Sequence, residues 1–305
     1  MKIIALLPFK NEEWILPTFL SNVLPIVDEI ISLDDSSTDN SKKIMEDAGA
    51  KVYPLTRNND MEYGASITPR QKLLELGRES GGTHFVMLDA DETFTTNFTK
   101  VARGLMEQMS PGDELWMQWL ALWESWDHYR HDGTVWSNNF KDFIFCDDGV
   151  SQHAYNGRSL HSIGRTPGEN HRHLRIPNEI GGVLHYQFSN MNLFHLKQTW
   201  YRMIEHVKYG PGNEGEINGT YSITLLNENV GMAKCPDHWL ENIPLPENKN
   251  NFDPEWNEEN LVRPDYLDEM LSMMDKHGAE YFKNLNIWHV KPLRDRYIKE
   301  TGVSP

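Results

Sequence analysis

Three acidic side chains follow a short apolar run near residue 90. In THFVMLDADETF, residues 85–88 lead directly into Asp89, Asp91 and Glu92. Carboxylates this close repel one another unless something offsets their charge. Mn²⁺ and Mg²⁺ favour carboxylate oxygens, and Mg²⁺ often takes only one or two of them together with substrate phosphates. The stretch therefore predicts either a metal site or a solvated loop that caps the next helix.

Polar residues also follow two earlier apolar runs. Asp34 and Asp35 come directly after EIISL, and residues 8–13 (PFKNEE) overlap and follow the first run, IIALLP. If these runs are parallel strands, three strand ends at one edge of a sheet carry hydrogen-bonding groups, and α/β sheets bind ligands at that edge. N-capping of the next helix is the alternative for Asp34 and Asp35, and also for Asn11 and Glu12.

The first 110 residues alternate between strand-like and helix-like segments, which predicts a mostly parallel sheet covered by helices on both faces. Strands are expected at 3–8, 29–33, 51–55 and 83–88, and helices from about 16, at 38–49, 68–78 and 98–109. The sequence TPRQ places Thr68 as the N-cap of the third helix. After residue 113 the alternation ends, and helices are expected from about 193 and at 264–285.

Taken together, PFKNEE, LDDSSTDNS and LDADE resemble the P-x-x-N-E-E, D-D-x-S-x-D and D-x-D motifs of family 2 glycosyltransferases in order and spacing. The resemblance covers residues 1–110 well and 111–210 loosely. It implies an α/β, GT-A-like fold, a Rossmann-like mostly parallel sheet flanked by helices, with a helical C-terminal extension. The implied domains are a catalytic domain at 1–210, with a nucleotide-sugar half (1–112) and an acceptor half (113–210), and a mostly helical extension at 211–305.

The resemblance also implies residue roles. Donor contacts are expected from Pro8, Phe9, Asn11, Glu12, Asp34, Asp35, Arg70, Asp89 and Ala90. Of these, Asp35 is favoured as the contact to the base, and a surface helix cation is the alternative for Arg70. The implied ligands of Mn²⁺ or Mg²⁺ are Asp89, Asp91 and His185, the histidine of GGVLHYQF. A histidine that simply packs on a strand is the alternative for His185.

The sequence of the acceptor half identifies catalytic residues less clearly than the nucleotide-sugar half does. An inverting transfer needs a group that takes the proton of the acceptor hydroxyl. The candidates are Asp148, Glu169 and His161, and the spacing does not choose between them. Core packing is expected for most of the tryptophans after residue 113, with Trp126 and Trp136 as the exceptions that could line an acceptor groove.

The composition of the chain limits which binding partners and which cellular compartment we expect. The formal charge of −16 does not suit binding to nucleic-acid phosphates. The two cysteines lack CxxC spacing, which disfavours a thiolate zinc site and fits a reducing compartment, although the two could pair. No run approaches the roughly 20 apolar residues of a membrane span, and the apolar run at the start is too short for a signal peptide. We expect a cytoplasmic protein.

The sequence thus predicts a metal-dependent, inverting glycosyltransferase that moves a sugar from a nucleoside-diphosphate sugar, with a UDP-sugar favoured, to a hydroxyl of a glycan or another acceptor. A sugar-phosphate nucleotidyltransferase is one alternative, disfavoured because no glycine follows the first strand. A non-catalytic nucleotide-sugar-binding module is another. A histidine-rich metal hydrolase is disfavoured because no HExxH spacing occurs. The C-terminal segment could cover the acceptor site or form a homodimer contact.

Overall fold

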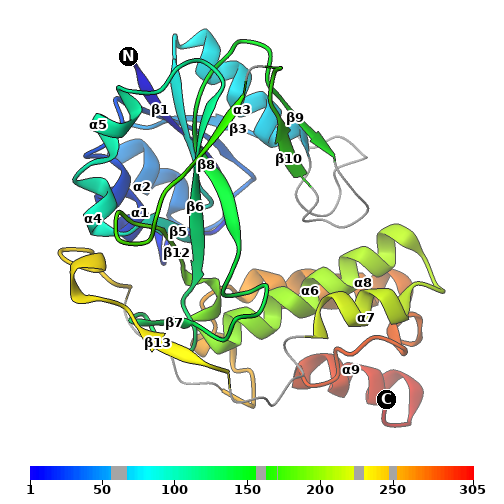
Figure 1. Cartoon of the computed structure of the whole chain (residues 1–305). Coiled ribbons are helices and arrows are strands. Elements are labelled where there is room, and N and C mark those ends of the chain that lie inside the picture. The colour runs from blue at the N-terminus through cyan, green and yellow to red at the C-terminus, as the bar shows by residue number, and fades with distance from the viewer. Residues whose placement is uncertain (56–66, 156–162, 170, 223–229, 247–252) are drawn as a thin grey trace. The chain divides into compact units, whose positions relative to one another are not determined.

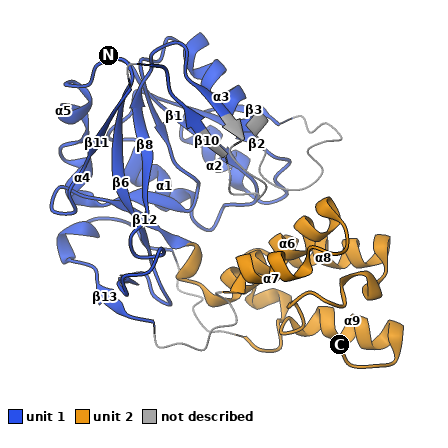
Figure 2. Ribbon diagram, turned by 45° about the vertical axis from the view of Figure 1, so that its right-hand side comes forward, with its two compact units in different colours: residues 1–61, 65–186, 230–248 blue, residues 62–64, 187–229, 249–305 orange. Residues whose placement is uncertain are grey.

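The chain forms two compact units, which are described separately (Figure 2). The computed structural model describes residues 1–55, 67–155, 163–169, 171–222, 230–246 and 253–305. The first unit comprises Met1–Met61, Ala65–Tyr186 and Val230–Asn248, and the second comprises Glu62–Gly64, Gln187–Asn229 and Lys249–Pro305. The domain boundaries expected at residues 112 and 210 stay predictions.

A mixed sheet lies at the centre of the first unit (Figure 1). Its strand order is β3-β2-β1-β4-β8-β6-β12-β5, and β11 pairs with β6. The strands are β1 (Ile3–Phe9), β2 (Glu29–Asp34), β3 (Lys51–Pro54), β4 (His84–Met87), β5 (Glu92–Phe94), β6 (Asp113–Ala121), β8 (Phe140–Cys146), β11 (Arg172–Arg175) and β12 (Val183–His185). Most neighbouring pairs are parallel, while β8 runs antiparallel to β4 and β6, and β5 runs antiparallel to β12. The predicted fold class is confirmed.

Helices cover the sheet because its central strands are apolar on both faces. Every residue of β1 except Pro8 is buried. On one face, Leu73 and Leu74 of α3 pack against alternate residues of β1, Ile4 and Leu6, in one apolar cluster. The helices of this unit are α1 (Leu16–Val23), α2 (Ser41–Asp47), α3 (Ile67–Glu79), α4 (Thr96–Thr99) and α5 (Ala102–Met106). Burial on both faces explains why these strands read as continuous apolar runs in the sequence.

Shorter elements complete the first unit. They are β7 (His128–Arg130) paired with β13 (Met232–Lys234), β9 (Gln152–Tyr155) paired with β10 (Ile163–Thr166), and the 3₁₀ turn η4 (Asp237–Trp239). Cys146 and Cys235 are buried and free, so they do not pair with each other. Among the residues that the structure describes, no helix has both the length and the apolar character needed to cross a membrane.

Three helix predictions need correction. The helix expected at 98–109 is broken at Lys100 and Val101 into α4 and α5; Phe98 and Ala102 are buried, whereas Val101 at the break is exposed. α5 is anchored separately, because Arg103 donates hydrogen bonds to the Ile26 carbonyl and to Asp28. α3 begins at Ile67, so Thr68 lies inside the helix and is not its N-cap. α2 begins at Ser41 rather than near residue 38.

Gly181 and Gly182 allow β12 to approach the turn between β5 and α4 closely. The Gly182 N–H donates to Thr95 Oγ1 at 3.1 Å, and the Thr95 N–H donates to the Gly182 carbonyl at 3.0 Å. Gly181 has φ +151°, and a Cβ there would meet the Cβ of Phe98 and lie 2.7 Å from Thr95 Oγ1. Only a residue without a side chain fits this approach. The glycine therefore sets where β12, and with it His185, meets β5.

We expect Gly181→Ala to lower the free energy of unfolding by about 2–4 kcal/mol, because the methyl group adds both steric overlap and backbone strain. Urea unfolding followed by circular dichroism measures the change. Gly104→Ala is the matched control, since Gly104 lies in α5 with open space around the added Cβ. Equal stability of the two variants would contradict the packing argument.

The second unit is helical. It contains α6 (Met191–Tyr209), α7 (Glu214–Thr220), α8 (Pro264–His277) and α9 (Lys291–Thr301), with 3₁₀ turns at Glu258–Asn260 and Ala279–Phe282. A further 3₁₀ turn, Tyr186–Phe188, spans the boundary between the two units in the sequence. The helices expected from 193 and at 264–285 are found, but α8 ends at His277 because Gly278 follows with φ +81°. Helix α9 was not predicted. The polar residues Thr199, Arg202 and Glu205 on the long α6 are buried.

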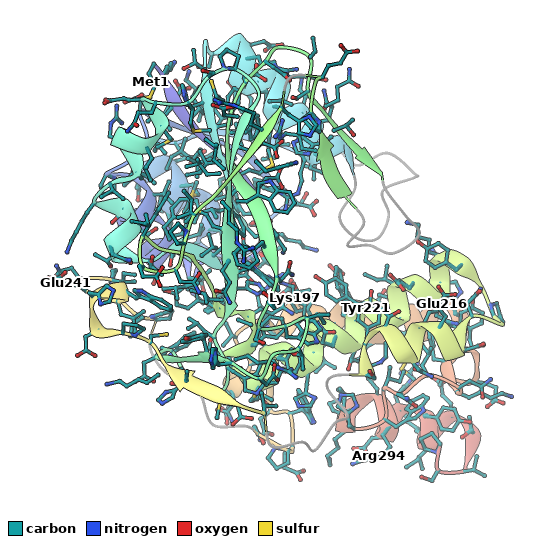
Figure 3. All side chains as sticks on the ribbon, in the orientation of Figure 1. Met1, Lys197, Glu216, Tyr221, Glu241 and Arg294 are labelled. Carbon is teal, nitrogen blue, oxygen red and sulfur yellow. The ribbon has the colours of Figure 1, made fainter. Side chains whose placement is uncertain are left out.

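These buried polar groups have partners from other segments of the unit, Tyr221 just after α7 and His289 just before α9. Arg202 donates to the Tyr221 carbonyl, and the Tyr221 hydroxyl, labelled in Figure 3, donates to Glu205 at 2.8 Å. The rings of His195 and His289 lie 5.2 Å apart, and His289 Nε2 lies 3.2 Å from Thr199 Oγ1. Burial, with the nearby charge of Arg202, lowers the pKa of His195 to about 4. Burial, with His195 and Arg202, lowers the pKa of His289 to about 3.

We expect the helical unit to lose stability as the pH falls below about 6.5, the ordinary histidine pKa. The folded state holds both histidines neutral to a lower pH than the unfolded state does. Their contribution is therefore complete above that value and is lost as protons favour the unfolded chain on the way down to about pH 4. Melting temperatures of the full chain between pH 7.5 and 5 measure the slope.

His289→Gln should reduce the slope of melting temperature against pH, because it removes one of the two titrating groups and keeps a hydrogen-bonding partner for Thr199. His238→Gln, at an exposed position of the first unit, is the control and should leave the slope unchanged. A slope that is the same in all three proteins would show that the buried histidines do not control it.

Candidate functional site

The three strand ends with polar residues lie at one edge of the sheet. Phe9, at the end of β1, pairs with Asp34, at the end of β2. On the other side of β1, Leu6 pairs with Met87, the last residue of β4. The loops that begin with Lys10, Asp35 and Leu88 therefore start side by side. The sequence prediction placed them together for the same reason, which is that parallel strands end at a common edge.

The loops after β1 and β2 are tied to each other by the side chain of Asn11. Asn11 Oδ1 accepts a hydrogen bond from the Thr38 N–H at 2.7 Å, and the Asn11 N–H donates to Ser37 Oγ at 3.0 Å. Asn11 is 6% exposed and has φ +52°, a left-handed conformation that asparagine tolerates better than most residues. Its role in the structure is to join two loops.

Other predicted donor-contact residues in this region make local contacts that shape the loops. Asp34 Oδ1 accepts from the Ser37 N–H at 2.9 Å, and Glu12 Oε2 accepts from the Trp14 indole N–H at 2.8 Å. The Asp35 N–H donates to the Phe9 carbonyl at 2.9 Å, which fixes the Asp35 backbone beside β1. Pro8 and Phe9 end β1 itself. The nucleotide contacts assigned to these residues stay predictions.

A tight turn follows β4 and carries the acidic motif. The Glu92 N–H donates to the Asp89 carbonyl at 3.0 Å, which closes the turn over the buried Ala90. Arg70, near the start of α3, donates from Nη2 to Asp89 Oδ1 at 2.7 Å. Arg70 is therefore not an isolated surface cation, because it pairs with Asp89 of the acidic turn, while its contact with the nucleotide stays a prediction.

Asp91 and His185 meet at the same turn. Asp91 Oδ2 lies 3.4 Å from His185 Nε2, and both side chains are about 5% exposed. The backbone brings them together, because the Tyr186 N–H donates to the Asp91 carbonyl and β12 pairs with β5. The prediction that His185 lies beside the acidic motif agrees with this placement, although its role as a metal ligand stays a prediction.

Glu92 is buried beneath the turn and holds it in shape. It is 3% exposed, and its Oε2 accepts from the Asp89 N–H at 2.9 Å. Its Oε1 accepts from the indole N–H of Trp119 at 2.6 Å. Burial and the charges of Asp89 and Asp91 raise the pKa of Glu92 to about 7, while Lys141 opposes the rise. Both oxygens accept from N–H groups, so the ionised form suits the hydrogen bonds even though burial disfavours it.

Two of the three candidates for the catalytic base lie far from this edge. The Asp147 N–H donates to the Thr83 carbonyl, just before β4 begins, so Asp148 is at the opposite end of that strand from Asp89. Asp148 accepts from the N–H groups of Val150, Ser151 and Gly168, and these bonds outweigh its burial and lower its pKa to about 2. A carboxylate held in this way forms a turn and is a poor proton acceptor.

Glu169 follows Gly168 in an exposed turn at that same end, and His161 lies outside the described residues. The structure therefore does not bring Asp148 or Glu169 to the acidic turn, and their catalytic roles lose support. Trp126, expected as an exception to core packing, is only 7% exposed and lies against the rings of Trp14 and Tyr186. That expectation is corrected. Trp136 is half-buried.

Sequence reasoning missed the contacts that surround Glu92. Trp119 was expected to serve only as core, yet it donates to Glu92 and stacks on His185 with ring centroids 4.2 Å apart. Lys141, on β8, lies over the Trp119 ring with its Nζ 3.7 Å from the centroid. The alternation of strand β6 could have placed Trp119 on a face, but no local pattern shows that a tryptophan contacts a carboxylate 27 residues away.

The segment that runs from β1 to just beyond α5 matches a known protein family. Residues 5–112 match the model of glycosyl transferase family 2. The family 2 resemblance is confirmed for this segment. The match includes Asn11, Asp35, Arg70, Asp89 and Asp91, all of which lie on or beside the carboxyl edge of the sheet. A comparison with curated proteins finds no match.

Solved structures with similarity to the chain include two bacterial proteins. One is glucosyl-3-phosphoglycerate synthase from Mycobacterium tuberculosis, in complex with Mn²⁺, uridine diphosphate and glucosyl-3-phosphoglycerate. It is 21% identical over 39% of this chain and 44% of that chain, with a TM-score of 0.29. The other is S. aureus TarS 1-349, which is 13% identical over 98% of this chain and 89% of that chain, with a TM-score of 0.39. The match thus spans less than half the length of the synthase.

The donor atoms around the turn of the family 2 segment fit a hard divalent cation that arrives with phosphate. In the part of the chain that the structure describes, no three His, Cys, Asp or Glu side chains form a ready metal cage. Asp91 lies close to His185, and Asp89 is paired with Arg70. Mg²⁺ commonly takes one or two carboxylates and completes its shell with substrate phosphates and water, and imidazole also suits Mn²⁺. The carboxylate and imidazole groups present match that donor set.

We expect Glu92→Gln to lower the free energy of unfolding by about 1–3 kcal/mol, since the amide can accept only one of the two hydrogen bonds and its own NH₂ would face an N–H donor. Urea unfolding at pH 8, where Glu92 is largely ionised, measures the loss. Glu107→Gln, at an exposed position, is the control. If Glu92→Gln and Glu107→Gln unfold alike, the carboxylate does not stabilise the turn.

Proposed function

We propose that this chain is a metal-dependent glycosyltransferase that moves a sugar from a nucleoside-diphosphate sugar, with a UDP-sugar favoured, to a hydroxyl acceptor. The observation that carries the proposal is the pairing of Asp91 with His185 beside Asp89, within the family 2 segment and at the edge where the Asp35 loop begins. Family 2 motifs and a suitable donor set thus support the same site.

Residues of this chain have separate tasks in the proposed reaction. The loops joined by Asn11 provide a fixed wall for the nucleoside, with Asp35 beside it. Asp89, Asp91 and His185 would hold Mn²⁺ or Mg²⁺, which supplies positive charge to the departing diphosphate as the sugar bond breaks. Arg70 lies within hydrogen-bonding distance of Asp89, so its guanidinium is available for a phosphate oxygen when the carboxylate binds metal.

The stereochemical outcome belongs to this proposal as well. We propose inversion at the sugar carbon, in which a base removes the proton of the acceptor hydroxyl while the hydroxyl oxygen forms the new bond and the diphosphate leaves. Asp148 and Glu169 lie at the opposite end of β4, so neither is assigned as that base. His161 stays a candidate outside the described residues.

A thermal-shift series tests the donor site. We expect UDP, GDP or dTDP to raise the melting temperature when Mn²⁺ is present and to do so much less in EDTA, because ligand binding to the folded state stabilises it by mass action. If none of the three nucleotides stabilises the protein with Mn²⁺, the proposed donor site is wrong. Release of pyrophosphate from a nucleoside triphosphate and a sugar phosphate would support the nucleotidyltransferase instead.

We expect Asp91→Asn to reduce Mn²⁺-dependent activity by about 100-fold or more, since it removes a charge that holds the metal on the leaving group. The assay is sugar release from the donor that the thermal-shift series identifies. Asp47→Asn, on the exposed surface of α2, is the matched control and should retain activity. Unchanged activity of the Asp91 variant, with its fold intact by circular dichroism, would remove Asp91 from the metal site.

A further inference from the structure

Lys141 lies near the acidic turn, on the strand next to β4. Val86 of β4 pairs with Ile144 of the antiparallel β8, and both strands continue from there to the edge that carries the turn. Lys141 is three positions before Ile144, and Asp89 is three positions after Val86. The antiparallel register therefore places Lys141 and Asp89 at about the same height along the two neighbouring strands.

The position of the Lys141 ammonium is fixed through Trp119. Its Nζ lies 3.7 Å from the centre of the Trp119 ring, a distance at which a cation is attracted to an aromatic face. Trp119 is held in turn by its hydrogen bond to Glu92 and by stacking on His185. The Lys141 ammonium is thus connected through the Trp119 ring to His185 of the proposed metal site and to Glu92 beneath the acidic turn.

Lys141 differs from Arg70, the cation that lies at the acidic turn and is paired with Asp89. Lys141 forms no ion pair or side-chain hydrogen bond with any residue that the structure describes, although it is close enough to lower the pKa of Glu92 by its charge. An ammonium group offers three donors and acts on phosphate as a compact point charge.

We propose that Lys141 is an anion-binding residue whose ammonium contacts a phosphate oxygen of the donor diphosphate. The inference rests on the proposed function, because it takes the acidic turn as the place where the diphosphate binds. The donor is favoured over an acidic acceptor because Lys141 is linked through Trp119 to Glu92 and His185, which border that turn. In the reaction, the Lys141 ammonium and the divalent metal ion would together stabilise the negative charge that develops on the diphosphate leaving group.

A purely structural role makes a different prediction. If Lys141 served only to offset the charge of Glu92 and its neighbours, replacing it would change stability and leave the recognition of phosphate unchanged. The readout must therefore compare ligands that differ only in their phosphates. Uridine and UDP form such a pair, and GDP with guanosine, or dTDP with thymidine, replaces them if the thermal-shift series selects that base.

The experiment measures the affinity of each ligand by titration calorimetry with Mn²⁺ present. Lys141→Met removes the charge and keeps a flexible chain on the Trp119 ring, and Lys141→Arg restores a cation. Lys43→Met is the matched control, because Lys43 is exposed on α2 and pairs with Asp47. We expect Lys141→Met to bind UDP roughly 10- to 100-fold more weakly and uridine unchanged, as the loss of one charge-assisted hydrogen bond implies. Lys141→Arg should recover much of the loss.

Each other outcome overturns a specific statement. Equal UDP affinity in wild type and Lys141→Met rejects the phosphate contact and leaves the proposed function intact. If inorganic phosphate binds to the UDP-saturated wild type but not to the UDP-saturated Lys141→Met variant, and UDP affinity is the same in both, the lysine recognises an acidic acceptor instead. Failure of the wild type to bind any of the three nucleoside diphosphates rejects the proposed function and this inference together.

Discussion

The first unit depends on a single electrostatic constraint, the crowding of three carboxylates into four residues at the end of β4. The structure meets it in three ways. Asp89 is paired with Arg70, Asp91 lies beside His185, and Glu92 is buried with two N–H donors on its oxygens. Such charge would destabilise an isolated loop. Here the partners come from a helix, a distant strand and a tryptophan, so the turn requires most of the sheet to be in place.

The order of the strands determines which side chains reach the acidic turn. His185 reaches the turn because β12 pairs with β5, and Trp119 reaches it because β6 lies on the other side of β12. Gly181 permits the close approach of β12 to the turn before α4. The acceptor half of the sequence thus contributes groups to the same edge as the nucleotide-sugar half. The acidic turn and its partners therefore come together only when the sheet is complete.

The sequence alone predicted the features that depend on local periodicity. It predicted fewer of the features that depend on contacts between distant residues. The four strands of the nucleotide-sugar half and the common edge of the acidic residues followed from apolar runs and their endings, and Arg70 followed from the family motifs. The break between α4 and α5 could not be predicted, because apolar residues keep a helical spacing in the sequence across it, although Val101 at the break is exposed. Asp148 looked suitable as a base because it follows a strand, but that strand, β8, is antiparallel and ends at the opposite edge. The direction of one strand therefore decided which acidic residues meet.

The Asn11 bridge has a consequence for how this surface can vary. Its side-chain oxygen Oδ1 accepts from the Thr38 N–H, and its backbone N–H donates to Ser37 Oγ, so it binds two successive residues of the neighbouring loop. The two loops therefore behave as one rigid body, and a change of length in either would leave buried polar groups without partners in the other. Related sequences should accordingly gain or lose residues in both loops together.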